Sequence, residues 1–245
     1  MSSSQAVTYK YLGHSTFLFT TPAGKKLIID PWLKNNPACP AADKTIAALD
    51  TMLITHGHFD HIQDAVELAQ QHKPQIGCIF ETALWLQRKG AQNVSPMNKG
   101  GSQKINDVRV TMVDARHSCG ILEDDGSVTY GGEACGYVVE FENSFRIYHA
   151  GDTAVFGDMK IIAELYQPHL VFLPIGDLFT MSPKEAAYAC RLMQAKRVVP
   201  MHYATFPPLV GTPEELRQLT KDLGTEVIAL RPGETGKQWP VMSDR

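Results

Sequence analysis

The chain has 245 residues, of which 44% are hydrophobic and 20% are charged, a composition typical of a globular protein with a substantial core. Its 23 basic and 26 acidic residues leave a net charge of −3, which lacks the basic excess that broad electrostatic capture of nucleic acid requires. No stretch reaches the roughly 18 consecutive apolar residues that a membrane span needs. The charge therefore disfavours extended nucleic acid as a partner, and the lack of an apolar stretch disfavours a membrane.

Strand-like runs rich in β-branched and aromatic residues recur along the chain, bounded by Gly, Pro, Asn or Asp. We expect strands at 9–20, 26–30, 51–55, 75–80, 108–115, 136–141, 145–149, 170–175, 197–201 and 226–230. Helical patterns lie between several of them, at 63–72, 82–89, 159–166, 183–194 and 213–223. The last two helices begin with Ser182 and Thr212, each followed by Pro and then by Glu three positions on, which is a complete helix-start signal.

Two segments, 17–30 and 137–152, share a strand-turn-strand pattern that ends in Asp, and each is followed by a further apolar strand and a helix. This weak repeat predicts two βα halves that meet face to face, with loops from both converging on one edge. Coincidence is the alternative, because strand-turn-strand patterns are common. No linker or low-complexity stretch interrupts the chain, so we expect one domain over 1–245.

The start of the chain has neither the basic stretch nor the apolar stretch of a secretory signal. The five Cys are scattered and never form a C-x-x-C pair. Such cysteines are typical of reduced thiols in a cytoplasmic protein, and they predict neither a disulfide framework nor a zinc knuckle.

The strongest local signal is a histidine motif, His56-Gly-His58-Phe-Asp60-His61, placed directly after the predicted strand 51–55. Because side chains repeat every second residue at a strand end, His56 and His58 can point the same way, while Asp60 and His61 face a second point nearby. Imidazole and carboxylate suit Zn²⁺, Mn²⁺, Fe or Ni²⁺, and the lack of thiolates argues against a closed structural zinc site. Four ligands in six residues exceed the needs of one catalytic metal, so the motif predicts two.

Further ligands should lie at the ends of other strands. His117 follows the predicted strand 108–115, Asp152 follows 145–149, and His202 follows 197–201. An Asp between two metals can bridge them, and Asp152 lies midway in order between the two His. Taken singly, each of these three residues rests on order and context alone.

These motifs resemble the metallo-β-lactamase superfamily, whose ordered signals are a strand-ending Asp, an H-x-H-x-D-H motif, and then His, Asp and His. Asp30, the histidine motif and the three later residues match that order between residues 30 and 202. The resemblance implies an α/β (α+β) fold, a four-layer αββα sandwich with a binuclear site at one edge. It also implies that one metal is held by His56, His58 and His117, the second by Asp60, His61 and His202, with Asp152 bridging.

Five segments resemble the branch of this superfamily that contains L-ascorbate-6-phosphate lactonase, and resemble still more the uncharacterised metal-dependent hydrolases beside it. They are 13–17, 28–32, 174–177, 179–181 and 200–203. The resemblance covers nearly the whole chain. It favours Mn²⁺, while ligation rich in His equally admits Zn²⁺ or Ni²⁺.

Two metals about 3.5–4 Å apart would lower the pKa of a shared water and stabilise the oxyanion formed on attack. Asp60 and Asp152 are therefore candidate catalytic residues as well as ligands, since they could orient or deprotonate the nucleophile. Asp30 is better interpreted as an outer residue that holds a ligand His in the right tautomer.

Four further polar residues are weaker candidates. His14 is a candidate catalytic residue that could reach the substrate, with a structural His as the alternative. Tyr203 could donate to an oxyanion, although core packing is favoured. Asp177 and Thr180 precede a predicted helix and would either position substrate or cap that helix. His149 lies on a strand and is expected to be buried.

The first functional hypothesis is a cytoplasmic, metal-dependent hydrolase that cleaves a small-molecule lactone, ester or amide, with or without a phosphate group. The alternative is a phosphodiesterase for small cyclic or dinucleotide phosphodiesters, since a two-metal clamp serves phosphoryl chemistry equally well. A diiron-flavin enzyme is disfavoured because His58 stands where those relatives have Glu. A homo-oligomer is compatible with the sequence.

Overall fold

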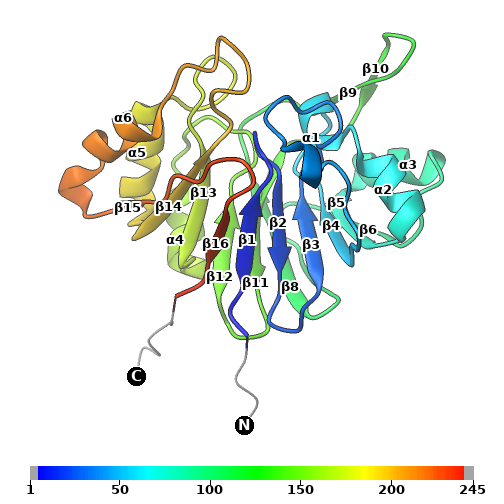
Figure 1. Ribbon diagram of the computed structural model, residues 1–245, viewed down its shortest axis with the longest axis horizontal. Helices are drawn as coiled ribbons and strands as arrows, with labels where there is room; N and C mark the ends of the chain where they lie inside the picture. The colour runs from blue at the N-terminus through cyan, green and yellow to red at the C-terminus, as the bar shows by residue number, and fades with distance from the viewer. Residues whose placement is uncertain (1–4, 240–245) are drawn as a thin grey trace.

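The computed structural model describes residues 5–239, which form two packed β-sheets with helices on both outer faces (Figure 1). In spatial order, the first seven-stranded sheet contains β16 (Thr235–Lys237), β1 (Thr8–Tyr11), β2 (Phe17–Thr20), β3 (Lys26–Ile29), β4 (Thr51–Leu53), β5 (Gln75–Ile79) and β6 (Val94–Met97). The second contains β15 (Glu226–Val227), β14 (Arg197–Met201), β13 (Leu170–Pro174), β12 (Arg146–His149), β11 (Cys135–Glu140), β8 (Val108–Asp114) and β7 (Ser102–Ile105).

The helices divide between the two outer faces. Those beside the first sheet are α1 (Phe59–Ile62), α2 (Ala65–His72) and α3 (Phe80–Arg88). Those beside the second sheet are α4 (Met159–Tyr166), α5 (Pro183–Met193) and α6 (Pro213–Leu219). Short 3₁₀ turns occupy Ala41–Asp43 and Lys221–Leu223, and a projecting hairpin consists of β9 (Gly120–Leu122) and β10 (Val128–Tyr130).

Three hydrophobic clusters lie between the layers and pack them together. The largest lies between the sheets and is rich in aromatic rings; Phe172 packs edge-on against Phe17, with 4.7 Å between ring centroids, and against Tyr9, with 5.7 Å. The other two clusters join each sheet to its own helices. The layers therefore run helix, sheet, sheet, helix, and the predicted αββα sandwich is confirmed.

The weak sequence repeat corresponds to a repeated topology. In the first sheet β2 and β3 form an antiparallel hairpin and β4 adds in parallel, and in the second sheet β11, β12 and β13 do the same. Parallel strands bring their carboxyl ends to one edge of a sheet, so loops from both halves meet there. The expectation of two similar halves is confirmed.

Several predicted elements differ in detail from the structure. The predicted strand 9–20 is two strands, because Gly13 and His14 have φ of 97° and 60° and turn the chain between β1 and β2. The predicted helix 63–72 starts earlier, as the short α1 and then α2. The helix starts at Ser182 and Thr212 are confirmed, since both side chains accept from the backbone N–H of the Glu three positions on.

Short strands with weak alternation escaped prediction, namely β6, β7, β9, β10 and β16. Each has at most four residues, too few to show a period. Within residues 5–239, no helix has the length and hydropathy needed to cross a membrane.

Candidate metal centre

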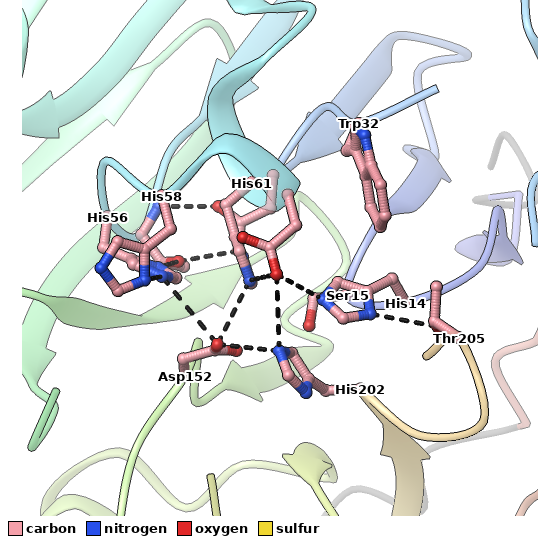
Figure 2. Close-up of polar contacts among 12 residues, drawn as sticks. His14, Ser15, Trp32, His56, His58, His61, Asp152, His202 and Thr205 are labelled. Atoms are coloured by element: carbon pink, nitrogen blue, oxygen red, sulfur yellow. Dashed lines mark hydrogen bonds and ion pairs between the residues drawn. The ribbon is translucent and has the colours of Figure 1, made fainter. Parts of the chain in front are cut away.

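The predicted ligands meet at the edge where β3, β4, β8, β12 and β14 end, on loops from both sheets (Figure 2). Two backbone hydrogen bonds join the sheets there: Cys135 N–H donates to Thr55 O at 3.0 Å, and His202 N–H donates to His14 O at 2.8 Å. Gly57 is required between the first two histidines, because a Cβ there would overlap the side chain of Ile121. The loops are therefore fixed relative to one another by packing and backbone pairing.

The first group of candidate ligands, the open group, consists of His56, His58 and His117. His58 Nδ1 lies 3.0 Å from His56 Nε2 and 3.2 Å from His117 Nε2. His56 is buried, whereas His58 and His117 are partly exposed. The three rings converge on one point, and the group has the composition and spacing of a metal site.

The second group, the buried group, consists of His14, Asp60, His61 and His202. Asp60 Oδ2 lies 2.9 Å from His14 Nε2, 3.9 Å from His202 Nε2 and 4.0 Å from His61 Nε2. All three His side chains are at most 1% exposed, and the rings of His14 and His202 lie 3.9 Å apart between centroids. The structure thus brings His14 into the centre.

Asp152 lies between the two groups. Its Oδ2 is 2.9 Å from His202 Nε2, 3.3 Å from His61 Nε2, 3.7 Å from His117 Nε2 and 3.9 Å from His56 Nε2. The carboxylate therefore faces ring nitrogens of both groups, as a bridging ligand would.

The donor set fits divalent metal ions. Among the described residues, Asp152 Oδ1, His61 Nε2 and both ring nitrogens of His202 are buried without a hydrogen bond of acceptable geometry. Buried polar atoms without partners are rare and costly in folded proteins. Several such atoms that converge on one place, all of types that bind Zn²⁺ or Mn²⁺, indicate that a metal completes their bonding.

Asp30 orients two of the histidines. Its carboxylate accepts from Thr55 N–H at 2.8 Å, from Thr55 Oγ1–H at 2.7 Å and from His61 Nδ1–H at 2.9 Å. Because the Thr55 hydroxyl donates to Asp30, its oxygen accepts from His56 Nδ1–H, 3.0 Å away. Both His56 and His61 thereby direct Nε2 to the centre, which is the geometry of an outer residue that sets a tautomer, and that role for Asp30 stays a prediction.

The charges of the centre favour a cation. Burial raises the pKa of Asp60, but His61 and the hydrogen bond from His14 outweigh it and lower that pKa to about 2. Burial lowers the pKa of His61, yet Asp152, Asp30 and Asp60 outweigh it and raise that pKa well above its ordinary value. Three carboxylates thus surround one imidazole, and positive charge stabilises them.

Four histidines of the centre, His14, His56, His58 and His117, have lowered pKa values, which favours the neutral form that binds metals. Burial lowers the pKa of His14 to about 4, and neighbouring His202 adds to the shift. Burial, with His61, also lowers the pKa of His56 well below its ordinary value and lowers that of His58. Burial likewise lowers the pKa of His117.

Backbone conformation is unusual at several of the predicted residues. His14, Asp30, Asp177 and His202 have φ of 60°, 54°, 67° and 55°, a region that costs a residue with a Cβ about 1–2 kcal/mol. Such conformations concentrate at functional sites, where the surrounding structure enforces them.

The weaker candidates, Tyr203, Asp177 and Thr180, lie in different environments. Tyr203 packs against the cluster between the second sheet and its helices, which is the core-packing alternative, so its catalytic role stays a prediction. Asp177 is exposed and accepts from Leu178 N–H at 2.8 Å, whereas the cap of α5 is Ser182. The hydroxyl of Thr180 is buried without a hydrogen-bond partner among the described residues. Their substrate-positioning roles stay predictions.

Three polar residues of the centre were not predicted. Thr55 connects Asp30 to His56, Ser118 Oγ lies 3.2 Å from His58 Nε2, and Thr205 Oγ1 lies 3.1 Å from His14 Nδ1. The only signal in the sequence was adjacency, since Thr55 and Ser118 each neighbour a predicted ligand.

Comparisons with known proteins agree with this geometry. The model of the Beta-lactamase superfamily domain matches residues 25–203. The UPF0173 metal-dependent hydrolase of Koribacter versatilis is 54% identical over 94% of this chain and 98% of its own, and that of Solibacter usitatus is 56% identical over the same shares.

Solved structures show the same architecture. Igni18, a metallo hydrolase from the archaeon Ignicoccus hospitalis, is 33% identical, with a TM-score of 0.83 over 96% of this chain and 100% of its own. The isothiocyanate hydrolase from Delia radicum gut bacteria is 23% identical, with a TM-score of 0.71 over 94% of this chain and 98% of its own, and that likeness concerns the fold.

Proposed function

The chain belongs to the beta-lactamase superfamily and is a metal-dependent hydrolase with the metallo-β-lactamase fold, and we propose that it cleaves a lactone, ester or amide of a small molecule at a binuclear centre. The observation that carries this proposal is the position of Asp152, whose Oδ2 lies within 3.9 Å of ring nitrogens from both the open and the buried group.

The open group, with His56, His58 and His117, would hold one ion, and Asp60, His61 and His202 would hold the other. Two divalent ions, with Zn²⁺ and Mn²⁺ favoured over Ni²⁺ or Fe, would supply a water that ionises near neutral pH and charge stabilisation for an oxyanion. Asp152 would bridge the ions, and its second oxygen, without a hydrogen-bond partner among the described residues, would orient the attacking water.

His14 acts on Asp60 in this proposal. The Asp60 carboxylate needs a donor, so His14 Nε2 carries the proton at 2.9 Å and Nδ1 accepts from the Thr205 hydroxyl at 3.1 Å. This chain of hydrogen bonds fixes the Asp60 oxygen that faces the centre and keeps the carboxylate ionised, so that it would hold a metal ion and orient the nucleophile.

A carbonyl substrate is favoured over phosphodiesters by the motifs that resemble L-ascorbate-6-phosphate lactonase. The five cysteines are all free and buried, which supports the proposed cytoplasmic location.

The test is a substrate panel run on protein that has been stripped of metal and reloaded with Zn²⁺ or Mn²⁺. We expect turnover of activated esters and lactones, abolished by chelation and lost in Asp60→Ala and His117→Ala, one substitution in each group. Preferred cleavage of bis(4-nitrophenyl) phosphate or a cyclic dinucleotide would instead establish the phosphodiesterase alternative. Ester hydrolysis that survives both substitutions would place the reaction elsewhere.

A further inference from the structure

Three aromatic rings lie beside the buried group, and we call them the aromatic shelf: Trp32, Phe59 and Phe206. Ring centroids are 5.8 Å apart for Trp32 and Phe59, 5.7 Å for Trp32 and Phe206, and 6.4 Å for Phe59 and Phe206. The rings come from three separate segments: the loop after β3, the first residue of α1 and the loop after β14.

The shelf is continuous with the metal centre through His14. The His14 ring lies 5.1 Å from Trp32 and 5.7 Å from Phe206 between centroids, and its Nε2 contacts Asp60. Phe59 also stands between two candidate ligands in the histidine motif. A group bound on the shelf is therefore next to the place where the centre would act (Figure 2 shows Trp32 and His14 side by side).

The outer side of the shelf is open to a ligand. Phe59 is 48% exposed, although it adjoins a buried polar centre, and Phe206 is partly exposed. Trp32 is fixed beneath them, because it is 2% exposed and its Nε1–H donates to Gln63 Oε1 at 2.9 Å. Small-molecule sites are lined mainly by hydrophobic and aromatic side chains beside a few polar groups, and the shelf next to the metal centre has this composition.

The charges around the shelf do not suit an anionic substrate. The loop 203–212, which carries Phe206, has no charged residue. Cations on neighbouring loops already have partners: Lys34 Nζ binds Glu67 at 2.5 Å, Lys44 Nζ donates to Lys34 O at 2.7 Å, and Arg116 Nε lies 3.0 Å from Asp114. A phosphate group on the shelf would lose its hydration and would have to compete with these partners for a cation.

We propose that the aromatic shelf binds the acyl chain of the substrate, and that this chain is apolar and carries no phosphate. The inference rests on the proposed acyl hydrolysis and names its substrate class. Phe59 and Phe206 are then specificity-determining residues, because they contact the chain and not the carbonyl that is attacked.

The test compares 4-nitrophenyl acetate, butanoate and hexanoate with a hexanoate that ends in a phosphate group, using metal-loaded protein. Each buried methylene is expected to raise kcat/KM about fourfold in the unsubstituted protein. Phe59→Ala and Phe206→Ala should each flatten this dependence. Tyr188→Ala removes an aromatic ring of similar exposure, 54%, from α5 and should leave the dependence in place.

Direct binding separates this inference from the proposed function. Calorimetry with the free carboxylates, acetate to hexanoate, needs no turnover and should show the same gain with chain length, lost in Phe59→Ala. If no ester is cleaved but affinity still rises with chain length, the proposal that the shelf binds an apolar chain is supported and the proposal of acyl hydrolysis is wrong. Ester cleavage without dependence on chain length, an equal dependence in the shelf variants, or preference for the phosphorylated chain would each overturn the shelf.

Discussion

The open and buried groups of candidate ligands lie side by side, but they differ in burial and in hydrogen bonding. The buried group is enclosed, and its side chains hold hydrogen bonds to Asp30 and Thr205. In the open group Thr55 holds His56 and Ser118 Oγ lies 3.2 Å from His58 Nε2, but both His58 and His117 are partly exposed. The fold thus fixes the buried group before any metal arrives, whereas the open group depends more on the metal itself.

The largest effect is expected where the two groups meet. Asp152→Asn keeps the size of the side chain but removes the charge that both groups share, so we expect activity to fall more than about 100-fold, beyond the loss typical of an outer residue. Metal analysis by mass spectrometry should show that content falls at both positions. Loss of a single ion would break the bridging interpretation.

The two groups should also contribute differently to the free energy of unfolding of the metal-free protein. His61→Ala leaves Asp30, Asp60 and Asp152 without their buried cation, and should destabilise the metal-free protein by about 3 kcal/mol. His58→Ala removes a partly exposed ring and should change stability by less than about 1 kcal/mol. Urea unfolding in the presence of chelator measures both, and equal effects would contradict the difference between the groups.

A substitution of Asp30 measures how much the orientation of the ligand histidines contributes to metal binding. Asp30→Asn removes the charge that holds His61 and, through Thr55, His56, while the ligands themselves stay. Metal affinity should fall about 10- to 100-fold in a competition titration with a chelating dye. Thr55→Val interrupts only the connection to His56 and should cost less. A larger loss in Thr55→Val would show that Asp30 acts by another route.

The smallest effect concerns pH and a histidine outside both groups. Burial lowers the pKa of His149 from 6.5 to about 4, with Nε2–H donating to Ser15 O at 3.3 Å. As pH falls, the unfolded chain takes up this proton before the folded protein, so the free energy of unfolding decreases below pH 6.5, by about 2 kcal/mol at pH 5.

Substitution of this residue gives the control. His149→Gln cannot take up a proton in this range, so the difference in unfolding free energy between it and the unsubstituted protein should narrow as pH falls from 7 to 5. A constant difference across that range would mean that His149 takes up its proton as readily in the folded protein as in the unfolded chain, contrary to the lowered pKa.

The parts of the centre that sequence alone predicted are those set by local order. The histidine motif places four donors on one turn, and His117, Asp152 and His202 each follow a strand whose carboxyl end points to the same edge. The repeat of strand-turn-strand also corresponded to the two halves of the sandwich.

What could not be predicted depends on backbone conformation and on packing between distant segments. His14 reaches Asp60 because its left-handed backbone conformation, with φ of 60°, points its ring inward. No sequence pattern predicts such a conformation in a residue other than Gly. Tyr203 neighbours His202 but points to the core between sheet and helices. The shelf joins three segments that are far apart in the chain, so the sequence gives no sign that its rings lie together.

The central claim is a pair of metal ions bridged by Asp152, and anomalous scattering from crystals grown with Zn²⁺ or Mn²⁺ tests it most directly. Data collected on both sides of the metal absorption edge should give two peaks, one among His56, His58 and His117 and one among Asp60, His61 and His202, with Asp152 touching both. A single peak at full occupancy, or peaks outside these groups, would contradict the account.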